Sequence, residues 1–330
     1  MDTDIAAKAQ EFSKLFESLE AEIGKSIVGQ HQVVRGLLTA LFANGHVLLE
    51  GAPGLGKTLL VHSLGKATGL DFARIQFTPD LMPADIVGTN LIAEDSGRKV
   101  FQFQKGPVFT NILLADEINR ATPKTQSALL EAMQERHSTI AGTSYPMPDP
   151  FFVLATQNPI EMEGTYPLPE AQLDRFLVKL LVGYPSPDEL HEILDRTTSG
   201  VVDQPAKVLN QVSDLLDLQQ FVRAVPVARE VQNQVVTMVM ATHPGRPGSA
   251  PSATRFVRYG ASPRGAQAIL LCAKIEALLA GRLHVAWSDV CKSAAPALRH
   301  RLILNFEGEA EGVTADHIVD EALGLATASK

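Results

Sequence analysis

Cysteine, net positive charge and long apolar runs are all scarce in this chain of 330 residues. Its 2 cysteines, Cys272 and Cys291, lie in apolar helical patterns and are expected to be buried, reduced thiols rather than a disulfide or metal site. The 29 Lys and Arg are outnumbered by 37 Asp and Glu, so a general attraction to nucleic acid or anionic membrane is not expected. No apolar run reaches membrane-spanning length, and the acidic start does not resemble a signal peptide. We therefore expect a cytoplasmic protein without membrane insertion.

Short apolar runs recur between turn signals in the first half of the chain. They lie at 47–49, 72–77, 112–115, 151–155 and 176–182. Several are nearly unbroken, which is typical of parallel strands that helices cover on both faces, and helical patterns do lie between them. The sequence therefore predicts a doubly wound parallel sheet, interrupted by β-hairpins at 88–106 and 137–150.

The strand signals stop after Pro185, and we place a domain boundary there. The predicted domains are an α/β domain over 1–185 and a smaller helical domain over 186–330. Helices are expected at 212–224, 226–242, 263–281, 287–304 and 314–324. Pro296 is expected to kink or split the fourth of these helices, and the Pro- and Gly-rich segment 243–254 is expected to be a mobile loop.

A phosphate-binding loop follows the first predicted strand. Residues 51–58 read GAPGLGKT, which matches G-x-x-x-x-G-K-[ST], and an apolar helical pattern comes next. The glycines let backbone N–H groups point at phosphate oxygens, and the start of the helix adds its positive dipole end. Lys57 is expected to reach the β- and γ-phosphates, and the Thr58 hydroxyl to hold Mg²⁺. The predicted nucleotide-binding residues here are Gly51, Ala52, Pro53, Gly54, Leu55, Gly56, Lys57, Thr58 and Leu59.

Two adjacent acids, Asp116 and Glu117, end the apolar strand at 112–115. That strand is too apolar for the acid pair to be incidental, so we interpret Asp116 as a Mg²⁺ ligand and Glu117 as the general base for an attacking water. The next strand ends in TQNP, and neighbouring strands present their carboxyl ends at one crevice. Asn158 is therefore expected near the γ-phosphate, where it would orient the water; a turn-forming Asn before Pro is the alternative.

Two arginines are candidates for stabilising charge in the transition state. Arg175 lies in LDRF, just before the last apolar strand, and Arg264 lies in SPRG at a capped helix start. On spacing alone either residue is as readily a surface cation, but an inserted guanidinium accelerates phosphoryl transfer by roughly 10³ to 10⁵. A further cluster, Arg299-His300-Arg301, has no aromatic platform beside it and is interpreted as a solvated or interface patch.

These residues resemble the AAA+ superfamily, and specifically the MoxR family, which is close to the ATPase subunits of magnesium chelatase. The resemblance covers residues 24–305. It rests on the segments IVGQ, GAPGLGKT, LLADEINRA, ATQNP, EGTYPLPEAQLDRF and VRYGASPRG. It implies a P-loop NTPase αβα core with a five-stranded parallel sheet and a C-terminal, all-helical lid domain. It further implies that Asn158 is sensor 1, that Arg175 is the arginine finger acting on the neighbouring subunit's ATP, and that Arg264 is the sensor 2 arginine.

The resemblance also gives expectations for several other residues. Val28 and Gln30 would border the adenine, and Arg120 fits the family pattern as an interface residue without a clear role. The segment 88–106 resembles the family's helix 2 insert, and 137–150 resembles its hairpin before sensor 1.

MoxR-like ATPases are thought to be hexameric, chaperone-like motors that act with partners carrying von Willebrand factor A domains. The metal-binding Asp-x-Ser-x-Ser motif of such domains is absent here, so the partner would be another polypeptide. We therefore expect a ring-forming, Mg²⁺-dependent ATPase that remodels a protein client, often to insert a metal or cofactor.

Two other functions were weighed against this one. A nucleic-acid motor is disfavoured by the acidic balance and because the hairpin at 137–150 has no Lys or Arg apart from the neighbouring Arg136. A nucleotide-controlled scaffold, whose hydrolysis is incidental, is left open by the sequence.

Overall fold

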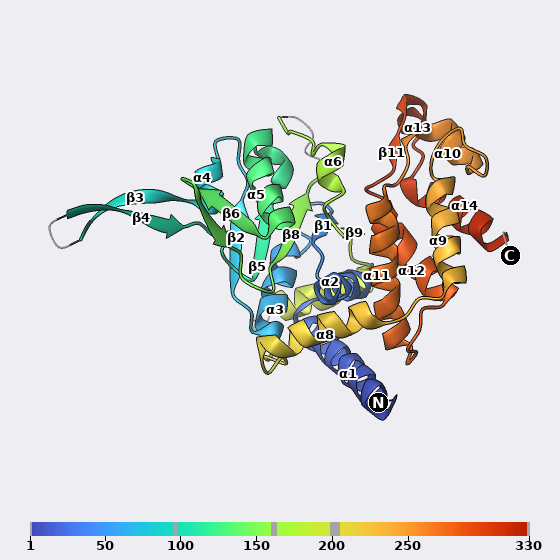
Figure 1. The fold of residues 1–330 in the computed structure, drawn as a ribbon, viewed down its shortest axis with the longest axis horizontal. Helices are drawn as coiled ribbons and strands as arrows, with labels where there is room; N and C mark the ends of the chain where they lie inside the picture. Colours follow the sequence, from blue (N-terminus) through green and yellow to red (C-terminus); the bar gives the residue numbers. More distant parts are fainter. Residues whose placement is uncertain (1, 96–97, 160–163, 199–204, 329–330) are drawn as a thin grey trace.

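A five-stranded parallel sheet forms the centre of the larger domain (Figure 1). The structure is a computed structural model that describes residues 2–95, 98–159, 164–198 and 205–328. The sheet order is β2-β5-β8-β1-β9, which confirms the predicted fold class. The strands are β1 (Val47–Glu50), β2 (Phe72–Gln76), β5 (Ile112–Asp116), β8 (Phe152–Gln157) and β9 (Val178–Leu181).

Both faces of this sheet are covered, because consecutive strand residues enter two different clusters of buried side chains. Leu49 and Leu114 belong to one cluster, and Leu48 and Leu113 to the other. This alternation explains why the strands read as unbroken apolar runs. The first face carries α1 (Asp2–Ser26), α2 (His31–Phe42) and α3 (Lys57–Thr68), and the second carries α4 (Pro83–Val87) and α5 (Pro123–Glu135).

Two hairpins leave the sheet region at the predicted places. The longer one pairs β3 (Gly88–Asp95) with β4 (Arg98–Lys105) and extends away from the body (Figure 1). The shorter one pairs β6 (His137–Ile140) with β7 (Thr143–Pro146). Arg136, the cation next to the shorter hairpin, donates to the Phe151 carbonyl and to Asn44 Oδ1, at 2.5 and 2.9 Å. Its guanidinium therefore binds the protein interior rather than facing a nucleic acid strand.

The second domain is a helical lid packed against the first (Figure 1). Its main helices lie close to the predicted ranges: α8 (Val212–Ala224), α9 (Arg229–Ala241), α11 (Pro263–Leu279), α12 (Trp287–Leu298) and α14 (Ala315–Ala328). A short two-stranded ladder of β10 (Val257–Tyr259) and β11 (Ile303–Leu304) is an addition to the expected helices. The boundary at residue 185 stays a prediction.

Several local expectations need correction. Helix α7 (Pro187–Thr198) lies between the predicted domain boundary and the predicted helix at 212–224, where no helix was expected, and α10 (Pro251–Phe256) forms within the expected mobile loop. The helix predicted over 287–304 is not split at Pro296, but it ends at Leu298, and Ile303–Leu304 form β11 instead. Cys272 is buried as expected, but Cys291 is exposed.

Three short elements complete the fold: η1 (Ile118–Arg120), α6 (Glu170–Leu173) and α13 (Phe306–Ala310). Among the described residues, none of the helices combines the length and the hydropathy needed to cross a bilayer.

Candidate functional site

The loop of residues 51–58 forms an open cradle between β1 and the start of α3. Gly54 and Gly56 have φ angles of +80° and +75°, a left-handed conformation that favours glycine. Apart from chain neighbours, no described atom lies within 4 Å of a Cβ built at either position, so the backbone there is open to a ligand. Lys57 Nζ donates to the Gly51 carbonyl at 2.6 Å, which folds the lysine back over the loop.

The two predicted acids lie at the end of the central strand β5. Asp116 is 8 % exposed, and its Oδ1 accepts a hydrogen bond from the Thr156 hydroxyl at 2.6 Å. That hydroxyl oxygen also accepts from the backbone N–H of Glu117 at 2.8 Å. A single buried threonine from β8 therefore orients both acids. The sequence analysis missed Thr156, although it precedes Gln157 and Asn158 in the motif that placed Asn158.

Two arginines and one amide bind a further oxygen of each acid. Arg74 Nη2 lies 2.6 Å from Asp116 Oδ2. Gln76 Nε2 and Arg120 Nη1 donate to Glu117 Oε2 at 2.7 and 2.9 Å. Arg74 and Gln76 were also missed by the sequence analysis. They belong to β2, whose residue Gln76 lies opposite Asp116 in the sheet, and that register is visible only once the strand order is known.

Lys57 and the two acids share one electrostatic environment. Burial lowers the pKa of the Lys57 ammonium, while the charges of Asp116, Glu117 and Glu50 act in the opposite direction. The open backbone cradle fits a polyphosphate, and the Thr58 hydroxyl with the Asp116 carboxylate supplies hard oxygen donors that fit Mg²⁺. The residues present therefore suit both predicted ligands.

Gln30, which is predicted to border the adenine, and Asn158, which is predicted to orient the lytic water, also lie near this loop. Gln30 Nε2 donates to the Gly183 carbonyl at 2.9 Å. Val182, which precedes Gly183, lies against the loop, because a Cβ built at Gly51 would be 2.6 Å from the Val182 carbonyl oxygen. Gln30 thus lies near the start of the loop, and Val28 precedes it by two residues in the chain. Asn158 is buried and directly follows β8. The residue before it, Gln157, accepts the Gly51 N–H on its carbonyl at 3.3 Å.

The predicted arginines form a second group. Burial, and then the nearby charge of Arg264, lower the pKa of the Arg175 guanidinium, so these two side chains are electrostatic neighbours. Glu135 and Glu131 on α5 act on Arg175 in the opposite direction. The charges that act on Lys57 come from different residues. Ser262 donates to Asp174, the residue before Arg175, and accepts the N–H of Arg264, so the two arginines lie on joined segments. No hydrogen bond or ion pair among the described residues joins either arginine to Lys57, Asp116 or Glu117. We therefore distinguish two sets: a nucleotide side around Lys57, and an arginine side around Arg175 and Arg264.

The basic cluster at 299–301 is not a solvated patch. The Arg301 side chain is 3 % exposed, and His300 is 4 % exposed. Both bind the segment between α6 and β9: His300 Nε2 lies 3.0 Å from the Phe176 carbonyl, and Arg301 Nε donates to Asp174 at 2.8 Å. The interpretation as a solvated patch is therefore wrong for these two residues, which join the lid to the core.

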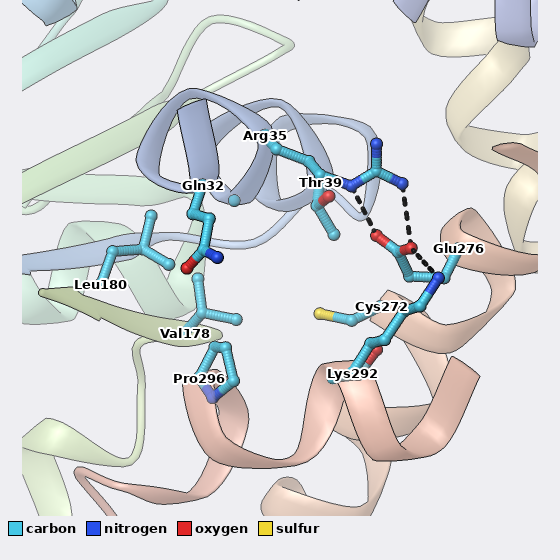
Figure 2. A pocket seen from close by; sticks show the side chains of 11 residues that line it. Gln32, Arg35, Thr39, Val178, Leu180, Cys272, Glu276, Lys292 and Pro296 are labelled. Atoms are coloured by element: carbon cyan, nitrogen blue, oxygen red, sulfur yellow. Dashed lines mark hydrogen bonds and ion pairs between the residues drawn. The ribbon is translucent and has the colours of Figure 1, made fainter. Parts of the chain in front are cut away.

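A separate cavity lies where α2 and β9 meet α11 and α12 (Figure 2). It has a volume of about 490 Å³, and its lining includes none of the predicted site residues. Arg35 pairs with Glu276 at one wall, with Nη2 2.9 Å from Oε2, and Lys292 Nζ lies 3.8 Å from the same oxygen. The opposite wall has Val178, Leu180 and Pro296, with the amide of Gln32 among them (Figure 2). The cavity belongs to the packing of lid on core rather than to the phosphate-binding loop.

The sheet order, the phosphate cradle beside two acids, and the helical lid define the chain as a AAA+ P-loop NTPase. The profile of the "ATPase family associated with various cellular activities (AAA)" matches residues 46–178, and the AAA lid domain profile matches residues 250–322.

Similar proteins narrow this class further. Chaperone MoxR1 of Mycobacterium tuberculosis is 47 % identical over 92 % of this chain and 79 % of its own length. Protein MoxR of Paracoccus denitrificans is 31 % identical over 92 % of each chain. The crystal structure of a Cytophaga hutchinsonii protein assigned as an ATPase superimposes with a TM-score of 0.87, at 40 % identity, over 96 % of both chains. The chain belongs to the MoxR family of AAA+ ATPases.

Proposed function

We propose that this protein binds Mg²⁺ and ATP at the nucleotide side and hydrolyses ATP there. The observation that supports this most directly is the open backbone cradle of residues 51–58 within electrostatic reach of Asp116 and Glu117. In this proposal Lys57 binds the β- and γ-phosphates, Thr58 and Asp116 hold Mg²⁺, and Val28 and Gln30 border the adenine. When bound, Mg²⁺ offsets the negative charge that the phosphate oxygens carry.

Glu117 acts as the general base in this proposal, and Asn158 orients the attacking water. The bonds from Gln76 and Arg120 hold Oε2 of the Glu117 carboxylate in position. The bond from Thr156 to Asp116 Oδ1 does the same for the metal-binding acid. Arg74 pairs with the other oxygen of Asp116, so it must shift for that oxygen to bind Mg²⁺. Apart from Arg74, the bonds that orient the two acids are in place before nucleotide arrives, which lowers the reorganisation needed for reaction.

We place the arginine side opposite the nucleotide side of an adjacent subunit in a ring, with a hexamer as the expected size. Arg175 and Arg264 are neighbours, and the charges acting on Lys57 belong to other residues. Two guanidiniums that repel each other are stabilised by an external anion. The γ-phosphate of a neighbour's ATP is such an anion, and Arg175 would act on it as an arginine finger, with Arg264 beside it.

The output of hydrolysis, in this proposal, is the remodelling of a protein client in the cytoplasm. Its support is the chaperone name of the Mycobacterium tuberculosis relative. The expected partner is a separate protein with a von Willebrand factor A domain, and the expected process is insertion of a metal or cofactor. A nucleic-acid client is disfavoured by the net charge of −8.

Phosphate release and ATP retention by the purified protein with Mg²⁺ test the chemistry. Glu117→Gln should retain ATP and release phosphate about 10² to 10⁴ times more slowly, because it removes a general base and no phosphate contact. Glu192→Gln, the same change on exposed α7, is the matched control and should behave as the unaltered chain. A normal rate in Glu117→Gln contradicts the assigned base. A chain that neither retains nor cleaves ATP at assembling concentrations contradicts the whole proposal.

Mixing tests whether the active site is shared. Arg175→Ala and Glu117→Gln should each be inactive alone, and mixed rings should recover activity, because one variant keeps the nucleotide side and the other keeps the arginine side. Absence of recovery at every ratio contradicts action across subunits.

The client is identified by trapping Glu117→Gln with ATP in an extract of the source cells and analysing what remains bound, with ADP as the comparison. An ATP-dependent protein is expected. Nucleic acid as the sole bound molecule would reverse the ranking, and equal protein binding with ATP and ADP would indicate a scaffold without a nucleotide switch.

A further inference from the structure

We propose that Asp174, Ser262 and Arg301 are positioning residues that clamp the lid to the core so that Arg175 and Arg264 are held as one unit. The proposal rests on the proposed function, because it concerns how the arginine side is presented to a neighbour's ATP. None of the three clamp residues is assigned contact with nucleotide.

The Arg301 side chain binds the backbone on both sides of Arg175. Nη2 donates to the carbonyls of Asp174 and Phe176 at 3.2 and 2.7 Å, and Nη1 donates to the Leu177 carbonyl at 3.1 Å. Nε donates to the Asp174 carboxylate at 2.8 Å. The Arg301 guanidinium of the lid thus donates to four acceptor atoms within core residues 174–177. Such a planar fork fixes orientation as well as distance, which a lysine ammonium does not do.

Ser262 connects the same carboxylate to the start of α11. Its hydroxyl donates to Asp174, with both carboxylate oxygens 2.9 Å away, and its oxygen accepts the backbone N–H of Arg264 at 3.1 Å. It is therefore the N-cap of α11 and a core contact at once. A continuous path leads from the Arg264 backbone through Ser262 to Asp174, which precedes Arg175 in the chain.

The charge on Asp174 keeps this arrangement together. Burial lowers the pKa of the Arg301 guanidinium, and Asp174 counteracts that effect. A buried guanidinium that lost its carboxylate would be destabilised, so the lid and the segment 174–177 should move together rather than separate. Figure 1 shows this segment between α6 and β9, at the junction of core and lid. Any change of lid angle then displaces Arg175 and Arg264 by related amounts.

The sharpest test is Ser262→Asp. Aspartate is a good N-cap, so α11 should keep its start, but a second carboxylate would face Asp174 and open the clamp. We expect the turnover number to fall about tenfold to 100-fold through misplacement of the arginines, with KM for ATP within about twofold, because the nucleotide side is untouched. Ser262→Thr keeps the hydroxyl and should retain activity. Arg282→Lys is a control for disturbing a lid ion pair away from the clamp, because Arg282 donates to both carboxylate oxygens of Asp289, at 2.7 and 2.6 Å.

Asp174→Asn provides a second variant if Ser262→Asp does not fold. It removes the charge and keeps the shape, and it should also lower the turnover number. Combined with Ser262→Asp, it should restore part of the activity, because the amide at position 174 can donate to the new carboxylate. A merely local loss of stability would instead make the double variant worse than either single variant.

Mixed rings separate this proposal from the proposed function. Ser262→Asp mixed with Glu117→Gln should regain activity, since the second variant supplies an intact clamp to the first variant's intact nucleotide side. If Glu117→Gln restores activity when mixed with Arg175→Ala but not when mixed with Ser262→Asp, the clamp alone is contradicted. Failure of both mixtures would overturn action across subunits, and the clamp with it. Normal turnover in Ser262→Asp would also overturn the clamp.

Discussion

The nucleotide side and the arginine side of this ATPase are built in opposite ways. Residues of the nucleotide side follow parallel strands of one sheet, and each comes with neighbours in the chain that form a recognisable motif. The arginine side joins a short core segment, 174–177, to two lid segments, 262–264 and 299–301. The first is fixed by the sheet, whereas the second depends on how two domains pack. The arginine side is therefore the part that a lid movement can change.

The two sides also differ in charge. Around Lys57 the neighbouring charges are acidic, and the acids themselves bind Arg74 and Arg120. On the arginine side, Arg264 acts on both Arg175 and Arg301 with the same sign of charge. The nucleotide side can hold a cation. On the arginine side, Glu131 and Glu135 act against the repulsion between Arg175 and Arg264, and a further anion would act in the same direction, which fits the proposed pairing of the two sides across subunits.

The largest effect we expect is that nucleotide-side variants cannot complement each other. Lys57→Ala should lose nearly all turnover, because the β- and γ-phosphates lose their only lysine in the loop. Mixed with Glu117→Gln it should stay inactive, since neither variant has an intact nucleotide side. Mixed with Arg175→Ala it should recover. Phosphate release at several mixing ratios measures the activity of both mixtures. Recovery in the mixture of Lys57→Ala with Glu117→Gln would contradict the assignment of both residues to one nucleotide side.

A substitution of Arg264 tests whether this residue belongs to the arginine side. Arg264→Ala should lower turnover by about 10²-fold with ATP binding retained, because it removes a cation from the transition state of a neighbour's reaction. Fluorescent-nucleotide binding and phosphate release, measured together, distinguish the outcomes. Weakened ATP binding by the altered subunit itself would transfer Arg264 to the nucleotide side.

Arg74 sharpens the account of the nucleotide side. Its guanidinium pairs with Asp116 Oδ2 and therefore competes with Mg²⁺ for that carboxylate. Arg74→Gln should lower the Mg²⁺ concentration for half-maximal turnover by about twofold to fivefold, since a half-exposed pair contributes up to about 1 kcal/mol. A magnesium titration of turnover measures this. A higher requirement for Mg²⁺ would show that Arg74 organises the acid rather than competing for it.

A smaller effect, expected only at acid pH, concerns His46, a buried residue directly before β1. His46 Nδ1 accepts the Val153 N–H at 3.1 Å and Nε2 lies 3.2 Å from the Met133 carbonyl, so the ring is neutral. Burial lowers the pKa of His46 to about 3. The unfolded chain takes up the proton below about pH 6.5, so the stability from this residue is present above that pH and is lost progressively as the pH falls toward 3.

His46→Gln keeps a donor and an acceptor but does not titrate. Between about pH 6 and pH 4, the free energy of unfolding should fall less steeply in this variant, by about 1.4 kcal/mol per pH unit. Urea unfolding at several pH values measures the slope. Equal slopes would mean that His46 is already protonated in the folded chain.

The elements best predicted from the sequence were those with a strong period or a motif. Strands such as 112–115 were predictable because both faces are buried and every residue is apolar. Helix α7 was missed because most of its residues are polar and none is fully buried, although Leu190, Ile193 and Leu194 do lie at helical spacing. Helix α10 was missed because Pro251 opens it within a stretch rich in Pro and Gly, where Pro at the first helical position is compatible with a helix.

The chemistry proposed for the nucleotide side can be inferred from the sequence alone, because a phosphate-binding loop and an acid pair at a strand end are formed by residues that are close together in the chain. The sequence could not determine the partners of those acids, since Arg74, Gln76 and Thr156 reach them only through the order of strands in the sheet. Nor could it show that Arg301 is buried against Asp174, 127 residues away in the chain. Only tertiary packing decides such contacts, because burial and ion pairing depend on which surfaces the folded domains bring together.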